Sequence, residues 1–178
     1  LGVCLSTRRN LCSHEEVSKY DNRNKVDALC RNMTTEYHRE GVKNEGIEGD
    51  LCDFYEGYET VALNTNLTGI YSIAEMKELG KEKGWCPYFA TRYFISIANI
   101  VVYNYQYMLD PKIANLVSKE IEENSIIVFD EAHNIDNICI EALSVTLDKR
   151  IVQASVHNIR NLSEIVSKVE EEDAQRLQ

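Results

Sequence analysis

Proline and glycine are scarce in this sequence, with 2 and 8 among 178 residues. This composition excludes collagen-like and low-complexity chains. Basic residues are also scarce. The sequence has 19 Lys and Arg and 29 Asp and Glu, which gives a formal net charge of −10. A protein that grips nucleic acid over its whole surface is therefore excluded, although a local basic path is not. At 44% hydrophobic residues, the chain still has enough apolar side chains for a core.

Long hydrophobic runs are missing. The longest uncharged stretch, residues 93–109, is shorter than a membrane-spanning helix and is interrupted by polar side chains, namely Ser96, Asn99, Asn104 and Gln106. The first twelve residues contain no apolar run typical of a secretory signal. We therefore expect no membrane segment. Because the sequence starts without methionine and in the middle of a pattern, we expect it to be an internal piece of a longer protein.

Close cysteine pairs of the C-x2-C type, which mark zinc knuckles, are also absent. The even number of cysteines, six, and the N-x-S/T triplets at Asn32, Asn66 and Asn161 allow a secreted disulfide framework, although such triplets also arise by chance. Cys12, Cys30, Cys52 and Cys86 are separated by 17, 21 and 33 residues. Four thiolates from separate loops can enclose an iron–sulfur cluster. A buried structural cysteine is the default for any one position, so spacing leaves these alternatives open.

Residues 1–70 show no long segment with a period of two or 3.6, so we expect irregular structure there. A region with so little regular structure and several cysteines usually needs a metal or cross-links to hold it. The charge of residues 1–98 is closer to balance than that of the rest of the chain. Residues 1–98 carry 12 basic and 15 acidic side chains, and residues 99–178 carry 7 and 14. Any nucleic-acid contact is therefore expected in residues 1–98, which contain five of the six cysteines.

Helices are predicted at three later places. Ser72-Ile-Ala-Glu75 is a capping-box sequence that predicts a helix ending at one of the next two glycines. Pro87 suits the first turn of a second helix, which would run to about Asn99. From Val152 to Val169, apolar residues recur at steps of three and four and predict a long amphipathic helix. That helix needs an apolar partner.

A strand–helix–strand unit is predicted between residues 100 and 129. Residues 100–103 and 125–129 are uncharged and rich in β-branched side chains, which indicates two buried strands. Residues 110–124 between them follow a helical pattern. Continuous hydrophobicity is typical of a parallel sheet covered on both faces, so the predicted fold class is α/β.

The second predicted strand runs directly into Asp130-Glu131-Ala132-His133. Ligands of open α/β sheets gather at the carboxyl ends of the strands, and a pair of carboxylates there suits a nucleotide-hydrolysing core. One carboxylate would hold Mg²⁺ through water, and the other would orient the attacking water. The alternative is an acidic turn that caps the next helix.

A phosphate-binding loop is not present. The required pattern is Gly, four residues, then Gly-Lys-Ser/Thr, and its nearest approach, Gly80-Lys81, is followed by Glu82. We therefore expect this chain alone not to hydrolyse ATP.

One helix face is suited to nucleic acid. Tyr88 and Arg92 are four residues apart, so they share a face of the predicted helix. An aromatic ring beside a guanidinium can stack on a base and contact a phosphate. Core packing is the alternative for Tyr88. Arg8 and Arg9 precede Cys12 and can neutralise thiolates or touch a phosphate.

Four segments together resemble the XPD family of iron–sulfur DNA helicases, in particular its eukaryotic branch within transcription factor TFIIH. They are STRRNLC (6–12), GWCPYFATRY (84–93), YNYQYMLDPKIANLVSKE (103–120) and IIVFDEAHNIDNICI (126–140). The resemblance covers nearly the whole chain and is patchy between Glu36 and Asn66. Paralogous iron–sulfur helicases of the Fanconi anaemia group J or telomere-length-regulating type are the alternative within the superfamily, and LDPKIA favours XPD. A non-catalytic, metal-stapled protein-binding module is the alternative outside it.

The resemblance implies a domain plan. Residues 1–98 would form an iron–sulfur cluster domain rich in loops and helices, inserted in a RecA-like motor domain. Residues 99–147 would be part of that motor domain, with its DEAH motif and parallel sheet, and residues 148–178 would start a helical arch domain.

The resemblance also implies residue roles. Cys12, Cys30, Cys52 and Cys86 match the family's ligands of a 4Fe–4S cluster. Asp130 and Glu131 match the acidic pair that serves Mg²⁺ and the hydrolytic water, and His133 matches the residue that couples the nucleotide site to other helicase motifs. A final set matches positions that contact DNA or the cluster, namely Tyr88, Arg92 and Arg8, with Arg9 beside them.

For the full-length protein, the resemblance implies a nuclear, ATP- and Mg²⁺-dependent helicase that moves 5′ to 3′. Its partners would be single-stranded and forked DNA and the other TFIIH subunits, in nucleotide excision repair and transcription initiation.

Overall fold

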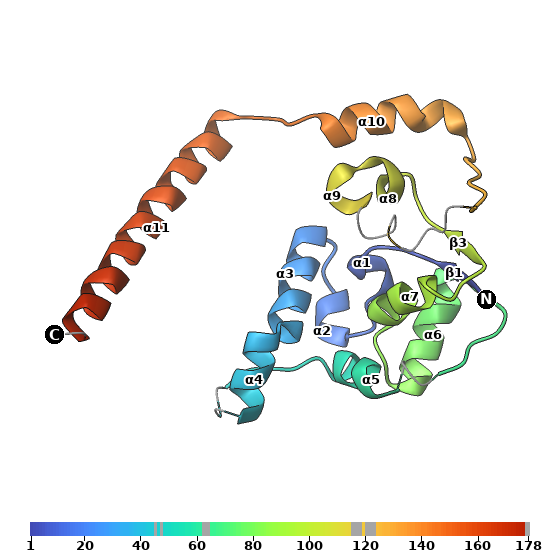
Figure 1. The fold of residues 1–178 in the computed structure, drawn as a ribbon, viewed down its shortest axis with the longest axis horizontal. Helices are drawn as coiled ribbons and strands as arrows, with labels where there is room; N and C mark the ends of the chain where they lie inside the picture. Colours follow the sequence, from blue (N-terminus) through green and yellow to red (C-terminus); the bar gives the residue numbers. More distant parts are fainter. Residues whose placement is uncertain (45, 47, 62–64, 115–118, 120–123, 177–178) are drawn as a thin grey trace. The chain divides into compact units, whose positions relative to one another are not determined.

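The structure is a computed structural model that describes residues 1–44, 46, 48–61, 65–114, 119 and 124–176 (Figure 1). The chain divides into two compact units, Leu1–Ile135 and Asp136–Gln178. The three domain limits expected from the sequence remain predictions.

A three-stranded parallel sheet lies in the first unit, in the order β2-β1-β3. Its central strand β1 (Gly2–Cys4) pairs with β2 (Ile70–Tyr71) on one side and with β3 (Ile100–Val102) on the other. The predicted α/β class with a parallel sheet is thus confirmed, and β3 is the strand predicted at 100–103. Only the middle residue of β3 is half-buried, so the expected full burial of this strand is wrong.

Two helices follow β2 where the sequence predicted them. Helix α6 (Ile73–Lys83) begins with the complete capping box of Ser72 and Glu75 and ends at Gly84, which has a left-handed φ of 73°. Helix α7 (Pro87–Ile95) has its proline in the first turn and ends four residues before the predicted position. Helix α6 contacts β2, and α7 contacts β1. The two helices also contact each other.

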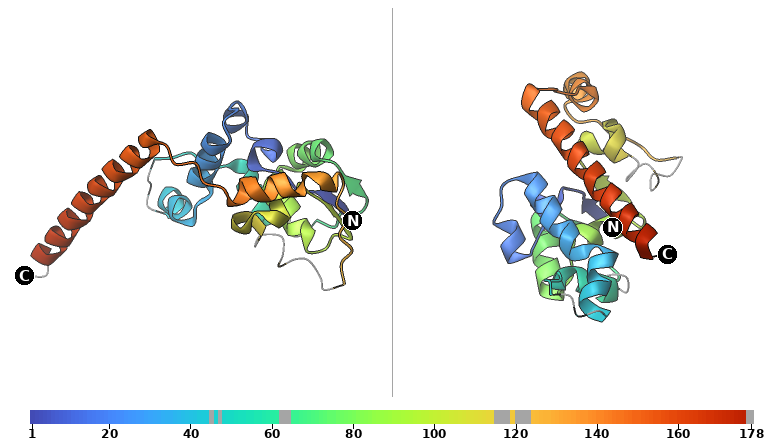
Figure 2. Two further views of the ribbon diagram at one scale, coloured as in Figure 1. Left: turned by 90° about the horizontal axis from the view of Figure 1, so that it is seen from above. Right: turned by 90° about the vertical axis from the view of Figure 1, so that its left-hand side faces the viewer.

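The prediction of irregular structure in residues 1–70 is wrong. Besides β1, the described residues of this region form five helices, namely α1 (Arg8–Leu11), α2 (Glu15–Ser18), α3 (Arg23–Thr34), α4 (Glu36–Asn44) and α5 (Asp53–Val61). Helix α4 follows α3 after Thr35 and contacts it (Figure 2). Each of the first three helices buries a single apolar side chain, Leu11, Val17 or Val26. One buried position per helix leaves no period to detect, so the sequence pattern failed here.

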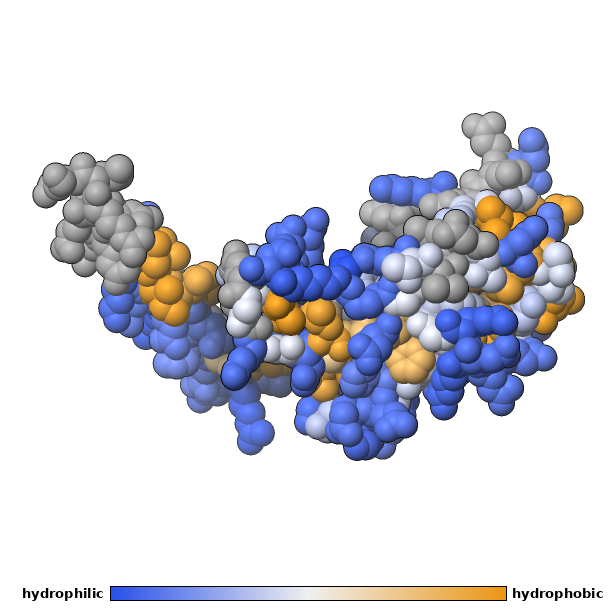
Figure 3. All heavy atoms as spheres, turned by 90° about the horizontal axis from the view of Figure 1, so that it is seen from below, coloured by the Kyte–Doolittle hydropathy of each residue, from blue (hydrophilic) through white to orange (hydrophobic). Residues whose placement is uncertain are grey.

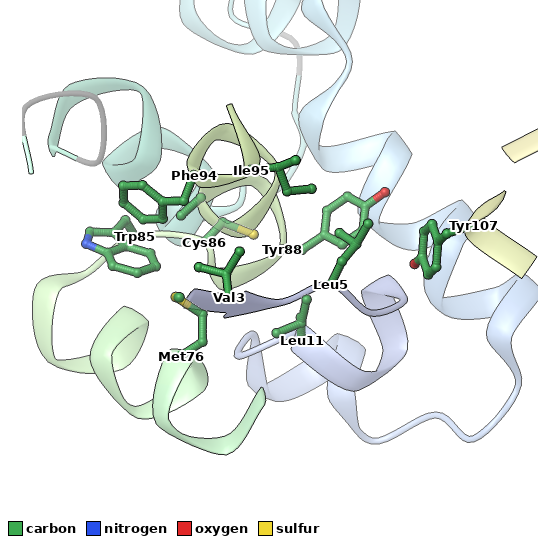
Figure 4. Packing of buried hydrophobic residues seen from close by; sticks show 11 residues of the cluster. Val3, Leu5, Leu11, Met76, Trp85, Cys86, Tyr88, Phe94, Ile95 and Tyr107 are labelled. Atoms are coloured by element: carbon green, nitrogen blue, oxygen red, sulfur yellow. The ribbon is translucent and has the colours of Figure 1, made fainter. Parts of the chain in front are cut away.

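The core of the first unit gathers side chains from β1, α1, α6 and α7. Trp85 and Phe94 pack edge to face with ring centroids 6.1 Å apart. Val3 and Met76 lie beside them, together with the thiol of Cys86 (Figure 4). The core thus reaches Cys86, the residue directly before α7.

Helix α5 approaches the end of α6 through Gly57. A Cβ at this position would lie 1.9 Å from the carbonyl oxygen of Gly84. We therefore expect Gly57→Ala to destabilise the fold by about 1–3 kcal/mol, because overpacking against backbone outweighs the gain of about 1 kcal/mol from alanine in a helix. Thermal unfolding measures this change. Glu78→Ala on the exposed face of α6 is the control, and unchanged stability of Gly57→Ala would contradict the close approach.

The predicted strand at 125–129 does not form. These residues have no regular structure, and the side chains of Ile126 and Val128 are 91% and 85% exposed. A strand needs a hydrogen-bonded neighbour, and no strand in the described part of the chain pairs with this segment. The predicted βαβ unit is therefore wrong for this structure, and β1, β2 and β3 supply the parallel sheet instead.

The helix predicted at 110–124 is partly observed. Helix α8 (Gln106–Leu109) precedes α9 (Pro111–Ala114), and most of the remaining predicted range lies outside the described residues.

The second unit contains the long helix α11 (Lys149–Arg176) and nearly all of α10 (Ile135–Leu143). The amphipathic helix predicted from residue 152 is thus confirmed. Figure 3 shows hydrophobic side chains along α11 next to hydrophilic ones. Its apolar side chains are exposed, for example Ile159 at 67% and Leu162 at 61%. None of the helices in the described part of the chain is both long and apolar enough to cross a membrane.

Candidate metal centre

Four cysteines that are far apart in the sequence line one cavity in the first unit. They are Cys12, Cys30, Cys52 and Cys86. Each is next to or within a different helix: Cys12 directly follows α1, Cys30 lies inside α3, Cys52 directly precedes α5 and Cys86 directly precedes α7. All six cysteines of the chain are free thiols, which does not support a disulfide framework. Cys4 and Cys139 lie outside the cavity.

Helix starts aim backbone N–H groups at two of these thiols. Cys86 receives the amides of Tyr88 and Phe89, and Cys52 receives those of Phe54 and Tyr55. Such donors at a helix N-terminus favour a thiolate. Helix α5, which follows Cys52, is tied to α4 by ion pairs in which Arg39 Nε lies 2.6 Å from Glu56 Oε1 and Arg39 Nη1 lies 2.9 Å from Glu59 Oε1.

Burial nevertheless keeps the thiols protonated in the absence of a cation. It raises the pKa of Cys86 to about 12 and that of Cys52 to about 11, and it raises the pKa of Cys12 and Cys30 as well. Arg8 opposes the effect at Cys30 through its charge and a hydrogen bond. Neighbouring cysteines raise one another's pKa further, so four thiolates can coexist in this cavity only with positive charge between them.

The four cysteine thiols are the kind of ligand that iron–sulfur clusters take. No three His, Cys, Asp or Glu residues among those described lie close enough together to hold one metal ion. A 4Fe–4S cubane takes one thiolate on each of four irons, so its ligands surround it from four sides. Besides the cysteines, the cavity is lined by the apolar side chains of Val17, Met33 and Phe54 and by three polar residues, Ser13, His14 and Thr34. Four thiols placed by four different helices around one cavity therefore fit this group.

Two polar residues of the cavity were missed from the sequence. Ser13 and His14 line it together with the cysteines, and their atoms Oγ and Nδ1 are buried without a hydrogen-bond partner. Their position directly after Cys12 was the available signal.

Arg8, Tyr88 and Arg92 come together next to the cavity. The Arg8 guanidinium carbon lies 4.5 Å from the centroid of the Tyr88 ring, and that of Arg92 lies 5.4 Å from it. Arg92 Nη1 also donates to the Tyr88 hydroxyl at 3.1 Å, as the shared helix face predicted. Tyr88 is only 7% exposed and belongs to the core, which is the alternative that the sequence left open for it.

Arg9 lies apart from this group. Its side chain is 45% exposed, and its Nη2 lies 2.6 Å from Oδ1 of Asp21, which is almost fully exposed. An ion pair this exposed contributes little to stability, so it leaves the guanidinium open to exchange partners.

The DEAH residues lie on an exposed turn. Glu131 has a left-handed φ of 49° and precedes the short 3-10 helix η2 (Ala132–Asn134). His133 Nδ1 lies 3.3 Å from Glu131 Oε2, and both side chains are about 70% exposed. Asp130 is exposed as well. The expected strand end behind this acidic pair is absent, since residues 125–129 form no strand.

Comparison with known proteins places the chain in a family. The family model DEAD_2 matches residues 1–152. The chain belongs to the DEAD_2 family. Among its relatives is the general transcription and DNA repair factor IIH helicase subunit XPD of Arabidopsis thaliana, which is 44% identical over 178 residues. That match covers 99% of this chain and 23% of the plant protein.

Other DEAD_2 relatives extend this comparison. The XPD/RAD3 subunit of Saccharomyces cerevisiae is 40% identical over 99% of this chain and 23% of its own length. The regulator of telomere elongation helicase 1 of Mus musculus is 31% identical over 97% of this chain and 13% of its own length. The chain thus spans about a quarter or less of the relatives that it matches. Higher identity to the XPD subunits confirms the resemblance drawn from the motifs, and it favours XPD over the telomere-regulating alternative.

Proposed function

We propose that this DEAD_2 chain is the part of an ATP-dependent DNA helicase that binds a 4Fe–4S cluster and supplies the DEAH motif. The full-length protein would move 5′ to 3′ as a nuclear TFIIH subunit, in nucleotide excision repair and transcription initiation. The observation that carries this proposal is the convergence of four cysteines on one cavity, in a chain 38–44% identical to XPD subunits over nearly its whole length.

The cluster would hold the short helices of the first 98 residues together. Cys12, Cys30, Cys52 and Cys86 are its ligands in this proposal, and they join α1, α3, α5 and α7. When bound, the cluster supplies four iron–thiolate bonds and a one-electron redox couple. Helices that bury one apolar side chain each gain little from packing alone, so these links stabilise the region that separates DNA strands.

Arginines beside the cavity would bind single-stranded and forked DNA. Arg92 and Arg8 are held by the buried Tyr88, which limits the entropy that they lose on binding a phosphate. Arg9 would exchange its exposed partner Asp21 for a phosphate. With Tyr88 only 7% exposed, its role is to position the guanidiniums rather than to stack on a base.

The DEAH turn would serve the nucleotide site of the full-length protein. Asp130 would hold Mg²⁺ through water, Glu131 would orient the attacking water, and His133 would couple this site to other helicase motifs. The phosphate-binding loop would come from the rest of the protein, because these 178 residues lack its pattern. In this proposal, residues 99–147 belong to the motor domain and residues 148–178 start the helical arch domain.

Iron analysis tests the proposal. The full-length protein, purified without oxygen, is expected to contain about four irons per chain and to absorb broadly in the visible range. A folded, colourless protein without iron would refute the cluster assignment.

Arg92→Ala is expected to weaken binding of single-stranded DNA and to lower the slope of log K against log salt by roughly 0.7, because one phosphate contact is lost. Fluorescence anisotropy at several salt concentrations measures both quantities. Lys83→Ala, at the end of α6, removes the same charge away from Tyr88 and is the control. Tyr88→Phe, which loses only the hydroxyl bonded to Arg92, should give a smaller decrease. An unchanged salt slope in Arg92→Ala would remove Arg92 from the DNA path.

A further inference from the structure

Two buried polar atoms in the cysteine cavity have no partner. Ser13 is 6% exposed, and its Oγ makes no hydrogen bond. His14 Nδ1 is likewise buried and unpaired, and both residues line the cavity together with the four cysteines. Nearly all buried polar groups in proteins are hydrogen-bonded, so two orphans in one small cavity indicate a ligand that satisfies them.

The backbone between α1 and α2 brings these side chains to the cavity. Cys12 and His14 both have extended backbone, with ψ of 129° and 122°. The backbone N–H of His14 also donates to the Cys12 thiol, which keeps the two residues together.

The cavity offers these side chains few other acceptors. Thr34, the remaining polar residue of the lining, donates its hydroxyl to the Cys30 carbonyl oxygen at 2.8 Å and makes no hydrogen bond with Ser13 Oγ or His14 Nδ1. Val17, Met33 and Phe54 have no oxygen or nitrogen in their side chains. Among the other side chains that line the cavity, the sulfur atoms of the cysteines and of Met33 remain as acceptors.

We propose that the Ser13 hydroxyl and the His14 ring N–H donate hydrogen bonds to the sulfur atoms of the bound cluster and raise its reduction potential. This inference rests on the proposed cluster site. Reduction adds one electron to a cluster that is already anionic with four thiolates. Donors to its sulfurs stabilise the reduced form more than the oxidised form. Ser13 and His14 are thus positioning residues that act on the cluster through its sulfurs.

Redox titration of the cluster-loaded, full-length protein tests this inference, with visible absorbance and electron paramagnetic resonance as readouts. Ser13→Ala and His14→Phe each remove a donor, and each is expected to shift the midpoint to more negative potential. A tenfold loss in the ratio of reduced to oxidised cluster corresponds to a shift of 59 mV for one electron. The double variant should shift further than either single variant.

Matched variants separate this effect from packing. Ser13→Thr and His14→Gln keep a donor, so they should stay near the wild-type midpoint. Ser18→Ala removes an exposed hydroxyl of α2, which bonds to the Glu15 carbonyl oxygen, and should not shift it. If Ser13→Ala and His14→Phe lose the cluster while the donor-keeping variants retain it, that result also supports hydrogen bonds from Ser13 and His14 to the cluster. If all four variants lose the cluster, packing explains the result and the inference fails.

An unchanged midpoint in Ser13→Ala and His14→Phe, at full iron content, would overturn the inference about these two donors but not the proposed cluster site. Absence of iron from the wild-type protein would instead overturn the proposed cluster site, so the two failures are distinguishable.

Discussion

Cys86→Ser is expected to abolish iron binding and to unfold the surroundings of the cavity. Cys86 is 7% exposed and directly precedes α7, whose Ala90 and Phe94 lie fully buried in the core. Structural Zn²⁺ contributes about 10–16 kcal/mol in zinc-finger peptides, a value similar to the total stability of about 5–15 kcal/mol of a typical domain, and a cluster with four thiolate ligands is expected to matter as much here. Losing one of four ligands therefore threatens the whole region rather than a local contact. Iron content and limited proteolysis of the full-length protein measure the two effects.

The two cysteines outside the cavity are the matched controls. Cys4 lies in β1 and Cys139 in α10, so Cys4→Ser and Cys139→Ser should keep about four irons per chain and the wild-type proteolysis pattern. Full iron content in Cys86→Ser would remove this residue from the ligand set. Loss of iron from Cys4→Ser would instead show that the cavity is not the binding site.

Elements fixed by local interactions were predicted well from the sequence. The capping box of Ser72 and Glu75 and the proline that begins α7 act within one helical turn, so neither depends on the rest of the fold. The stripe of α11 repeats over several turns and was clear for the same reason.

Elements that depend on distant partners were not predicted. Residues 125–129 have the composition of a buried strand, yet a strand forms only against a neighbour, and the described residues provide none for them. Helices α1, α2 and α3 form although the sequence pattern did not predict them. Each buries one side chain against other elements, which leaves no pattern along the chain.

In the candidate metal centre too, the features set by local spacing were predicted from the sequence, and those set by distant packing were not. Tyr88 and Arg92 were paired correctly, because residues four apart on a helix share a face. The burial of Tyr88 was not predictable, since it depends on contacts with Arg8 and the core. Spacing also said nothing about whether the cysteines meet, as their meeting depends on how α1, α3, α5 and α7 pack. The family resemblance supplied what the spacing did not.

In the full-length protein, Glu131→Gln is expected to leave nucleotide binding near its wild-type level and to reduce ATP hydrolysis by a factor of about 10²–10⁴, the usual contribution of a positioned general base. Glutamine keeps the size of the side chain, and the exposed turn has room for it, so the fold should not change. Only the carboxylate that polarises the attacking water is lost. Steady-state ATPase rates with single-stranded DNA and equilibrium binding of nucleotide separate the two quantities. Glu141→Gln, an exposed glutamate of α10, is the control and should hydrolyse ATP normally. Normal turnover in Glu131→Gln would exclude Glu131 from the reaction, whereas parallel loss of binding and hydrolysis would assign it to holding the nucleotide.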